Sequence, residues 1–496
     1  MEVALPSNSA NEPAIHKLVD DILENIFLLN ATLPDPELQH ATTVASSQVC
    51  TRWRSIALNF HTIWSLIIDY RRHSLKWIET LLDRSNPSLL DFGNRFITVC
   101  LEDGRQDVLE MVFNHIDRLR TFNIQVPARS WDLVCSRFLQ MPAPNLVTVF
   151  MYVLNNASGH LTHPLFDNHA PNLQIMGLYQ CTIDFTSSVL TSLTKLYVDL
   201  SEENTLPTVL EWLNILGGMP SLRSVHLNRA ISSGSPNDIF PFIHLDALDM
   251  LEVEGPLHEC VTLLKHLNVP LRCGLDLTCN DTHLGFDQRQ LWTIIEKKID
   301  SWAKNPYRRL NIAAGSGNVK IGNLPREENL WKSEEVDPTM SISLELSNVE
   351  GTVPLFHSLF ALFKRTFFDT TSLRIFDNDP VGTEAVTPSA DYFREFVNLE
   401  ELILRNDYLP RILLPFLHHT NPVLLPALKT FHFRNVTFQD GSDSILRLAD
   451  FLQWRKERGL PIQKIVIVTD LRRISREYVL SHIQDTVVEI IQRKRT

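Results

Sequence analysis

The chain has 496 residues, a formal net charge of -12 and a pI near 5.8; 44% of its residues are hydrophobic and 21% are charged. This composition is typical of a soluble globular protein, and the length predicts roughly three ordinary domains or one long repeat array. The acidic balance argues against nucleic acid as the main partner, because phosphate binding needs a basic surface, and no polybasic patch is present for an anionic membrane.

The seven cysteines are scattered and none forms a C-x-x-C pair, which predicts reduced thiols in the cytoplasm or nucleus rather than a disulfide framework. The first residues carry neither a basic region nor an apolar signal run. The most apolar stretch, Leu146 to Leu154, is shorter than the roughly 18 residues that a membrane span needs. We therefore expect no membrane association.

Residues 1–14 are polar, contain two prolines and are expected to be disordered. The following stretch to Phe27 predicts a helix, because its apolar residues recur at i,i+4 along one stripe. These residues are Ile22, Ile26, Leu23 and Phe27. Asp21 and Glu24 have the spacing of a capping box at the start of this helix.

A loop is expected around Pro34 to Pro36, followed by a second helix over 46–57 and a short third piece at 61–64. The second helix is predicted from apolar residues that recur every four positions, namely Ala45, Val49, Trp53 and Ala57. Two short amphipathic helices and a third piece bury too little apolar surface to form a stable domain alone. Part of their apolar surface is therefore expected to be covered by a partner.

The order L-V-x-D-I-L-x-x-I-F, then S-Q-V-C-x-R-W-R-x-I-A, then I-W-S-L-I resembles an F-box, most closely the F-boxes of filamentous fungi. Val19 departs from the family, which usually has proline after the leucine. The resemblance implies a three-helix domain over 15–70 that docks on the Skp-type adaptor of a cullin–RING ubiquitin ligase. The residues expected to contact that adaptor are Leu18, Val19, Ile22, Leu23, Ile26, Phe27, Val49, Cys50, Trp53 and Trp64. The plainer alternative is a helical hairpin that caps the following domain.

A linking helix is predicted within residues 71–90, with Leu75, Ile78, Leu81 and Leu82 on one face and Asn86-Pro87 after its end. Beyond it, one phrase, L-x-x-L-x-L, keeps returning over residues 91–496. Its copies begin at Leu119, Leu146, Leu173, Leu193, Leu222, Leu248, Leu271, Leu399, Leu428 and Ile462. Most steps, such as 119 to 146, fall within or near the 20–29 residues of leucine-rich repeats.

Each L-x-L phrase predicts a short strand with one buried face, and helical patterns lie between the copies. These patterns cover 107–118, 206–216, 290–302, 355–367 and 445–454, and a last helix over 474–491 is expected to cap the array. Residues 278–397 are the least regular, with strands predicted at 341–346 and 372–376 and loops at 315–337 and 377–389.

The predicted fold class is therefore α/β, an F-box followed by an irregular leucine-rich-repeat solenoid with parallel strands on one face and helices on the other. Its ladder of internal hydrogen bonds is mostly missing, since the expected Asn or Cys appears only as Cys181 and Asn280. An ordinary α/β sheet of unrelated βα units is the alternative, against which the regular step argues.

No catalytic or cofactor motif stands out. Gly315-x-Gly317 lacks the third glycine of a dinucleotide loop, His258-Glu259 lacks the second histidine of a zinc protease, and no G-x-S-x-G, Walker or kinase motif is present. We therefore expect neither an enzyme, nor a cofactor, nor a metal.

The residues between the leucines of each strand are expected to form an open, concave face suited to protein recognition. The two candidate target-binding patches are His226, Asn228, Glu252 and Glu254 in the middle of the array, and Glu401, Arg405, His432 and Arg434 near its end. The second patch is favoured, because arginines suit a carboxylate or phosphate on a target. The chain is thus interpreted as the substrate receptor of an SCF-type ligase, or alternatively as a ligase-independent interaction scaffold.

Overall fold

The structure is a computed structural model. It describes residues 14–93, 98–100, 105–154, 165–200, 206–235, 238–270, 272–279, 290–291, 293–297, 309–315, 318–323, 341–346, 370–377, 393–405, 414, 417–418, 420–434, 443–469, 476–483 and 486–492. The disorder predicted for residues 1–14 falls outside this range, except for Ala14, which begins a short 3-10 helix. The chain forms two compact units, residues 1–205 and 206–496. Both are α/β, with parallel strands and several helices.

Unit 1 begins with five α-helices and not with the three pieces and linking helix that the sequence predicts. They are α1 (Asp20–Ala31), α2 (Pro36–Ser46), α3 (Thr51–Asn59), α4 (His61–Leu66) and α5 (Leu75–Arg84). We call residues 14–70, which contain α1 to α4, the helical module. The linking helix is confirmed as α5, in which Ile78, Leu81 and Leu82 are buried.

The second helix predicted over 46–57 is correct from Thr51 onward, where α3 begins, and wrong before it, because α2 ends at Ser46 and a turn follows. The loop predicted around Pro34 to Pro36 is confirmed over 32–35, but it is short, and the helix α2, which was not predicted, begins at Pro36. The Asp35 carboxylate accepts hydrogen bonds from the first backbone N–H groups of the helix, and Pro36 occupies the first turn, where its missing N–H costs nothing.

The capping box predicted at Asp21 and Glu24 is also wrong. The N-cap of α1 is Val19, which offers no side-chain acceptor, and Asp20 and Asp21 both lie in the first turn. Their negative charges still favour this end of the helix, because the exposed N–H groups carry a partial positive charge.

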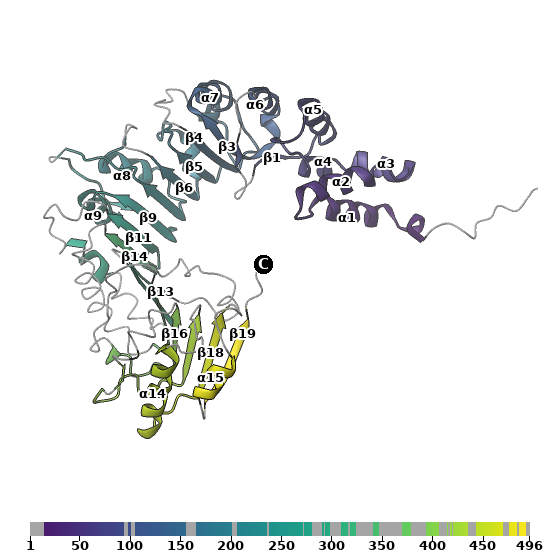
Figure 1. The fold of residues 1–496 in the computed structure, drawn as a ribbon. Coiled ribbons are helices and arrows are strands. Elements are labelled where there is room, and N and C mark those ends of the chain that lie inside the picture. Colours follow the sequence, from purple (N-terminus) through teal and green to yellow (C-terminus); the bar gives the residue numbers. More distant parts are fainter. Residues whose placement is uncertain are drawn as a thin grey trace, which may run out of the picture. The chain divides into compact units, whose positions relative to one another are not determined.

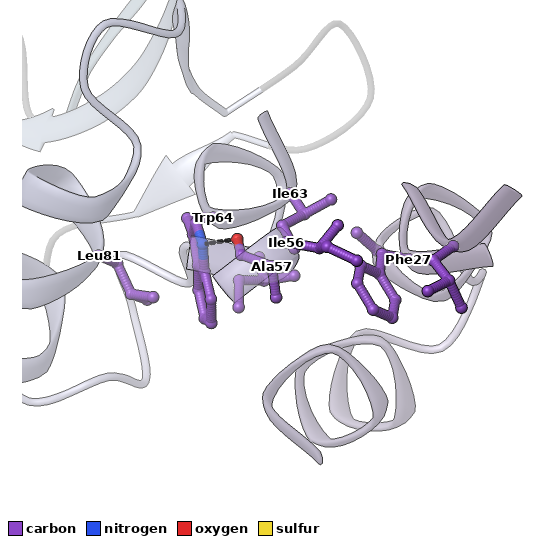
Figure 2. Close-up of a cluster of buried hydrophobic side chains, with 9 residues drawn as sticks. Phe27, Ile56, Ala57, Ile63, Trp64 and Leu81 are labelled. Atoms are coloured by element: carbon purple, nitrogen blue, oxygen red, sulfur yellow. Dashed lines mark hydrogen bonds between the residues drawn. The ribbon is translucent and has the colours of Figure 1, made fainter. Parts of the chain in front are cut away.

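One apolar core holds the helical module together. It contains Leu23, Phe27, Ala31, Ile56, Ala57, Ile63, Trp64 and Ile67, and Leu81 of α5 completes it. Figure 2 shows the indole N–H of Trp64 donating to the backbone carbonyl of Ala57, at 2.7 Å. The largest buried side chain of the module therefore also satisfies its one polar group.

The sheet of unit 1 is parallel throughout. Its strands are β1 (Leu90–Phe92), β2 (Val99–Cys100), β3 (Leu119–Pro127), β4 (Thr148–Leu154), β5 (Ile175–Tyr179) and β6 (Lys195–Asp199). Both β1 and β2 pair with β3, which continues through β4 and β5 to β6. Helices α6 (Gln106–Phe113) and α7 (Ala128–Leu133) lie over one face of this sheet (Figure 1).

Among the described residues of unit 2, the helices with defined bounds are α8 (Val209–Gly217), α9 (Leu257–His266), α14 (Asp443–Glu457) and α15 (Arg476–His482). Its main strands are β7 (Ser224–Asn228), β9 (Met250–Gly255), β11 (Gly274–Cys279), β12 (Arg309–Gly315), β13 (Asn318–Asn323), β14 (Ser341–Leu346), β15 (Ser372–Asp377), β16 (Glu401–Arg405), β17 (Thr430–Arg434), β18 (Lys464–Thr469) and β19 (Val487–Gln492). A separate short pair joins β8 (Ile243–His244) to β10 (Leu267–Asn268).

The main strands of unit 2 pair in parallel, with β13 as the exception. The order of neighbouring strands is β7-β9-β11-β14-β13-β12-β15-β16-β17-β18-β19. Strand β13 is antiparallel to both β12 and β14. The loop predicted over 315–337 is therefore wrong at its start, where β12 ends and β13 forms.

The last predicted helix, 474–491, is only partly correct. Helix α15 ends at His482, and the chain then forms β19, which pairs in parallel with β18. The helix predicted at 355–367 lies outside the described residues, as does the loop at 377–389 apart from Asp377.

The period-2 burial that the sequence predicts is confirmed. Six leucines of the repeated phrase have no exposed surface, namely Leu173, Leu178, Leu222, Leu227, Leu402 and Leu404. Gln174 and Arg223, which follow two of them, are exposed. Among the residues that the structure describes, no helix has both the length and the apolar character that crossing a membrane requires.

Candidate functional site

Helix α1 carries apolar residues on two adjacent faces. Leu23, Phe27 and Ala31 face the core and are buried. The second face consists of Val19, Ile22, Ile26 and Leu29, which we call the exposed stripe. Val19 is 62% exposed, Ile22 45% and Leu29 68%, while Ile26 packs partly against the core. Their spacing of three, four and three residues aligns them along one side of the helix.

The turn after α2 and the first residues of α3 lie along α1. The side chain of Asn30 donates to the Ser46 hydroxyl at 3.1 Å, near one end of α1. At the other end, Arg52 donates to the Asp20 carboxylate, with Nε at 3.1 Å. Val49 lies in the turn between these contacts and is 61% exposed. A second segment thus adds apolar surface beside α1.

The predicted adaptor-contact residues differ in burial, so some of them hold the module together while others are exposed to solvent. Three of them fill the core, namely Leu23, Phe27 and Trp64. Four are half-buried, namely Leu18, Ile26, Cys50 and Trp53. Three are exposed, namely Val19, Ile22 and Val49. The Cys50 thiol has a local role, since it caps α3 by accepting from the backbone N–H of Trp53.

Three further leucines of the module are exposed and were missed. They are Leu29, Leu38 and Leu58, of which Leu29 is the most exposed, and Ile15 before α1 is a fourth exposed apolar residue outside the prediction. Leu29 follows Ile22 and Ile26 by seven and three positions, so the helical spacing contained the signal needed to find it.

Two arginines join the helices to the sheet of unit 1. The Arg105 guanidinium donates to the backbone carbonyls of Tyr70, Arg71 and His73, which follow the module. The Arg118 guanidinium lies just before β3 and donates to three groups of the α5 end, the Leu82 and Ser88 carbonyls and the Ser85 hydroxyl. Burial lowers the pKa of Arg118, and these three acceptors offset part of the cost of burying its charge.

The middle patch of predicted target-binding residues lies across β7 and β9. His226 Nδ1 is 2.6 Å from a Glu252 carboxylate oxygen, and its Nε2 is 2.8 Å from the Ser224 hydroxyl. Arg229 lies 3.8 Å from the Glu254 carboxylate. The side chains of His226, Glu252 and Glu254 are half-buried and held in place by these contacts. This face therefore presents a fixed polar pattern, which lowers the entropy cost of binding a partner.

The terminal patch differs from its prediction. Glu401 accepts from the Ser372 hydroxyl at 2.7 Å and forms an ion pair with His432 at 2.5 Å. Arg434, predicted to be an exposed donor, is only 5% exposed, because the alternation of buried and exposed positions in β17 ends at Phe433. The side chain of Arg405 lies outside the described residues.

No known protein family and no curated protein matches this sequence. Within the described ranges, no three histidine, cysteine, aspartate or glutamate side chains are grouped so that they could hold a metal ion. Function is therefore inferred from the motif residues and from the surfaces on which the structure finds them.

Proposed function

We propose that this chain is the substrate-recognition adaptor of a cullin–RING, SCF-type ubiquitin ligase. The helical module docks on the Skp-type adaptor, and the strands that follow hold a target protein. One observation carries the proposal: the module has its own apolar core, yet it exposes Val19, Ile22 and Leu29 along one side of α1 and Val49 in the turn before α3. Apolar surface of this kind marks a binding site, because covering it releases roughly 25 cal/mol per Å².

We further propose that the parallel strands belong to an irregular leucine-rich-repeat solenoid. Supporting this, the strands are short, pair in sequence order over β3 to β6 and over β15 to β19, and alternate buried and half-exposed positions. In such an array each strand is stabilised by its neighbours. Its contribution to ubiquitin transfer would be positional, since binding raises the effective concentration of the target lysine near the ligase.

For target binding, the burial of Arg434 changes the preference between the two patches. We favour the middle patch as the target-binding site. There His226, Glu252 and Glu254 are half-exposed, and contacts with neighbouring side chains hold them in place. Crosslinking and mass spectrometry would compare target recovery by Glu252→Gln/Glu254→Gln with recovery by Glu401→Gln. The first variant should lose the target and the second should keep it, whereas the reverse result would assign the target to the terminal patch.

A ligase-independent scaffold, with the helices serving as a cap, is the second candidate. It is favoured by Leu81, which joins α5 to the core of the module, and by Arg118, which binds the end of α5 next to the start of β3. These contacts involve the part of the helices that adjoins the sheet. A cap would not explain why the apolar stripe of α1 is exposed to solvent. For this reason we prefer the adaptor proposal.

The two candidates are distinguished by co-purification with the Skp-type adaptor. The decisive variant is Ile22→Asp/Leu29→Asp, because both residues are exposed, whereas Ile26 also packs against the core. The matched control is Leu446→Asp/Leu480→Asp, which changes two leucines that are 44% and 45% exposed on α14 and α15. Wild type and control should bind the adaptor and the decisive variant should not. Binding by all three at equal strength would refute the proposal.

A further inference from the structure

Unit 2 contains an apolar groove that neither the motif residues nor the target patches occupy. It lies between the end of α9 with β10 on one side and the helical residues 290–291 and 293–297 on the other. Leu251, Leu264, Leu275 and Ile294 are among the residues that line it. Its volume of about 620 Å³ is in the range of ligand-binding sites.

The charge of this groove is opposite to that of the chain. The protein carries a net charge of -12, yet none of the described residues that line the groove is acidic. Lys265 and Lys297 both line it, and His244 is the third basic side chain. Lys265 donates one hydrogen bond to Gln290, and its ammonium group has two further N–H donors. An acidic ligand would therefore meet an attractive field here.

The apolar surface continues beyond the groove. Phe242 lines the groove and is 70% exposed, and Ile239 in the same loop is 90% exposed. The Phe242 ring lies 4.8 Å from the ring of His266, which holds it at the end of α9. A small ligand in the groove would leave Ile239 uncovered, whereas a protein partner would cover both side chains.

The polar side chains of the groove indicate the conformation of that partner. Asn268 is hydrogen-bonded to His244 at 2.8 Å, and Gln290 accepts from Lys265. These groups are engaged with one another, so they are poorly suited to satisfy the backbone of an extended peptide. An α-helix satisfies its own backbone and needs only an apolar stripe and charges on its flanks.

We propose that this groove docks an acidic amphipathic helix of a partner protein. Its apolar stripe would cover Phe242, Val269 and Ile294, which line the groove and keep exposed surface, and its carboxylates would pair with Lys265 and Lys297. The inference rests on the proposed function only in taking that partner to be a ligase target, because binding itself involves neither the helical module nor the Skp-type adaptor.

The test uses the full chain and two displayed libraries of 16-residue peptides patterned as amphipathic helices. Both libraries vary Leu, Ile, Phe and Met along the same stripe. One has Glu and Asp at the remaining positions, and the other has Lys and Arg. The acidic library should be enriched over the basic one. Lys265→Glu/Lys297→Glu should reduce that enrichment roughly tenfold or more, because like charges then face each other.

Two control variants complete the design. Lys17→Glu/Lys76→Glu makes the same change of charge on exposed residues of unit 1 and should leave the enrichment intact. Phe242→Ser should reduce recovery of the acidic library, and its exposed position makes unfolding an implausible cause. Ile22→Asp/Leu29→Asp should keep the enrichment, which separates this inference from the adaptor proposal.

The proposal is overturned if both libraries are recovered equally, if neither is enriched, or if the Lys265→Glu/Lys297→Glu variant keeps the preference of the wild type. It is also overturned if sodium dodecanoate binds the groove tightly while no peptide is selected. That result would assign the groove to a small acyl carboxylate.

Discussion

The helical module and the parallel strands differ in how completely they bury their apolar side chains. In the strands, the leucines of the L-x-L phrase are fully buried, because a neighbouring strand and the covering helices enclose each of them. In the module, a single core buries one face of α1 and leaves the exposed stripe in solvent. The comparison teaches that the strands bury their apolar residues against their neighbours, whereas the module leaves apolar side chains of α1 exposed.

The largest expected effect is on the core of the module. Trp64→Ala should cost about 3–5 kcal/mol, because it removes a fully buried indole. Trp64→Phe keeps an aromatic ring but leaves the Ala57 carbonyl without its donor, so it should cost less, about 1–3 kcal/mol. Urea unfolding measures both variants, and the alkylation rate of Cys50 reports on the module separately. Equal losses in the two variants would mean that packing of the ring contributes little.

The strands should respond to the loss of one leucine with a comparable but smaller cost. Leu222→Ala is expected to lower the free energy of unfolding by about 2–5 kcal/mol, because Leu222 has no exposed surface. The adjacent Arg223→Ala changes an exposed side chain whose ion pair with Asp249 is long, at 3.7 Å, and should cost less than about 1 kcal/mol. Thermal unfolding of the two variants measures both costs. A similar cost for both would contradict the prediction that Leu222 is a core residue and Arg223 a surface residue.

The joint between helices and sheet should show an intermediate effect. Arg118→Met removes three hydrogen bonds to the end of α5 and should cost about 1–3 kcal/mol, because buried acceptors lose their donor. Arg120→Met, two residues further along, removes only a surface pair with Asp91 and should cost about 1 kcal/mol or less. Chemical unfolding provides the measurement. If Arg120→Met proved the more costly change, Arg118 would not be the residue that fastens α5.

The fold could be predicted from the sequence wherever a local pattern and its tertiary environment agree. Met176 and Leu178 are an example, since their alternation indicates a strand and the parallel neighbours of β5 then bury them. The C-terminal strand was missed because apolar residues such as Val487 and Ile490 fit a helical period as well, and only pairing with β18 decides between the two. Strand β13 was missed because its two alternating apolar residues, Val319 and Ile321, stand among glycines and polar residues that favour a loop.

The site was predictable as a region but not residue by residue. Ile22 and Leu23 are adjacent in the sequence and equally apolar, yet one is 45% exposed and the other is fully buried. The side of α1 that faces the core depends on α3 and α4, whose boundaries the sequence misplaced. Arg434 shows the same limit, because burial at the end of β17 does not follow the alternation of the strand.

The smallest expected effect on stability tests the comparison most directly. Val19→Ser, Ile22→Ser and Leu29→Ser should each change the free energy of unfolding by no more than about 0.5 kcal/mol, because these side chains are exposed in the folded chain. Leu23→Ser, one residue from Ile22, should instead cost at least about 2 kcal/mol, as removal of a buried leucine does. Urea unfolding of the four variants measures this contrast, and adaptor co-purification of the combined triple variant shows whether binding is lost while the fold is kept. If the exposed-stripe variants destabilise the chain as much as Leu23→Ser does, both apolar faces of α1 serve internal packing, and the module offers no surface for another molecule.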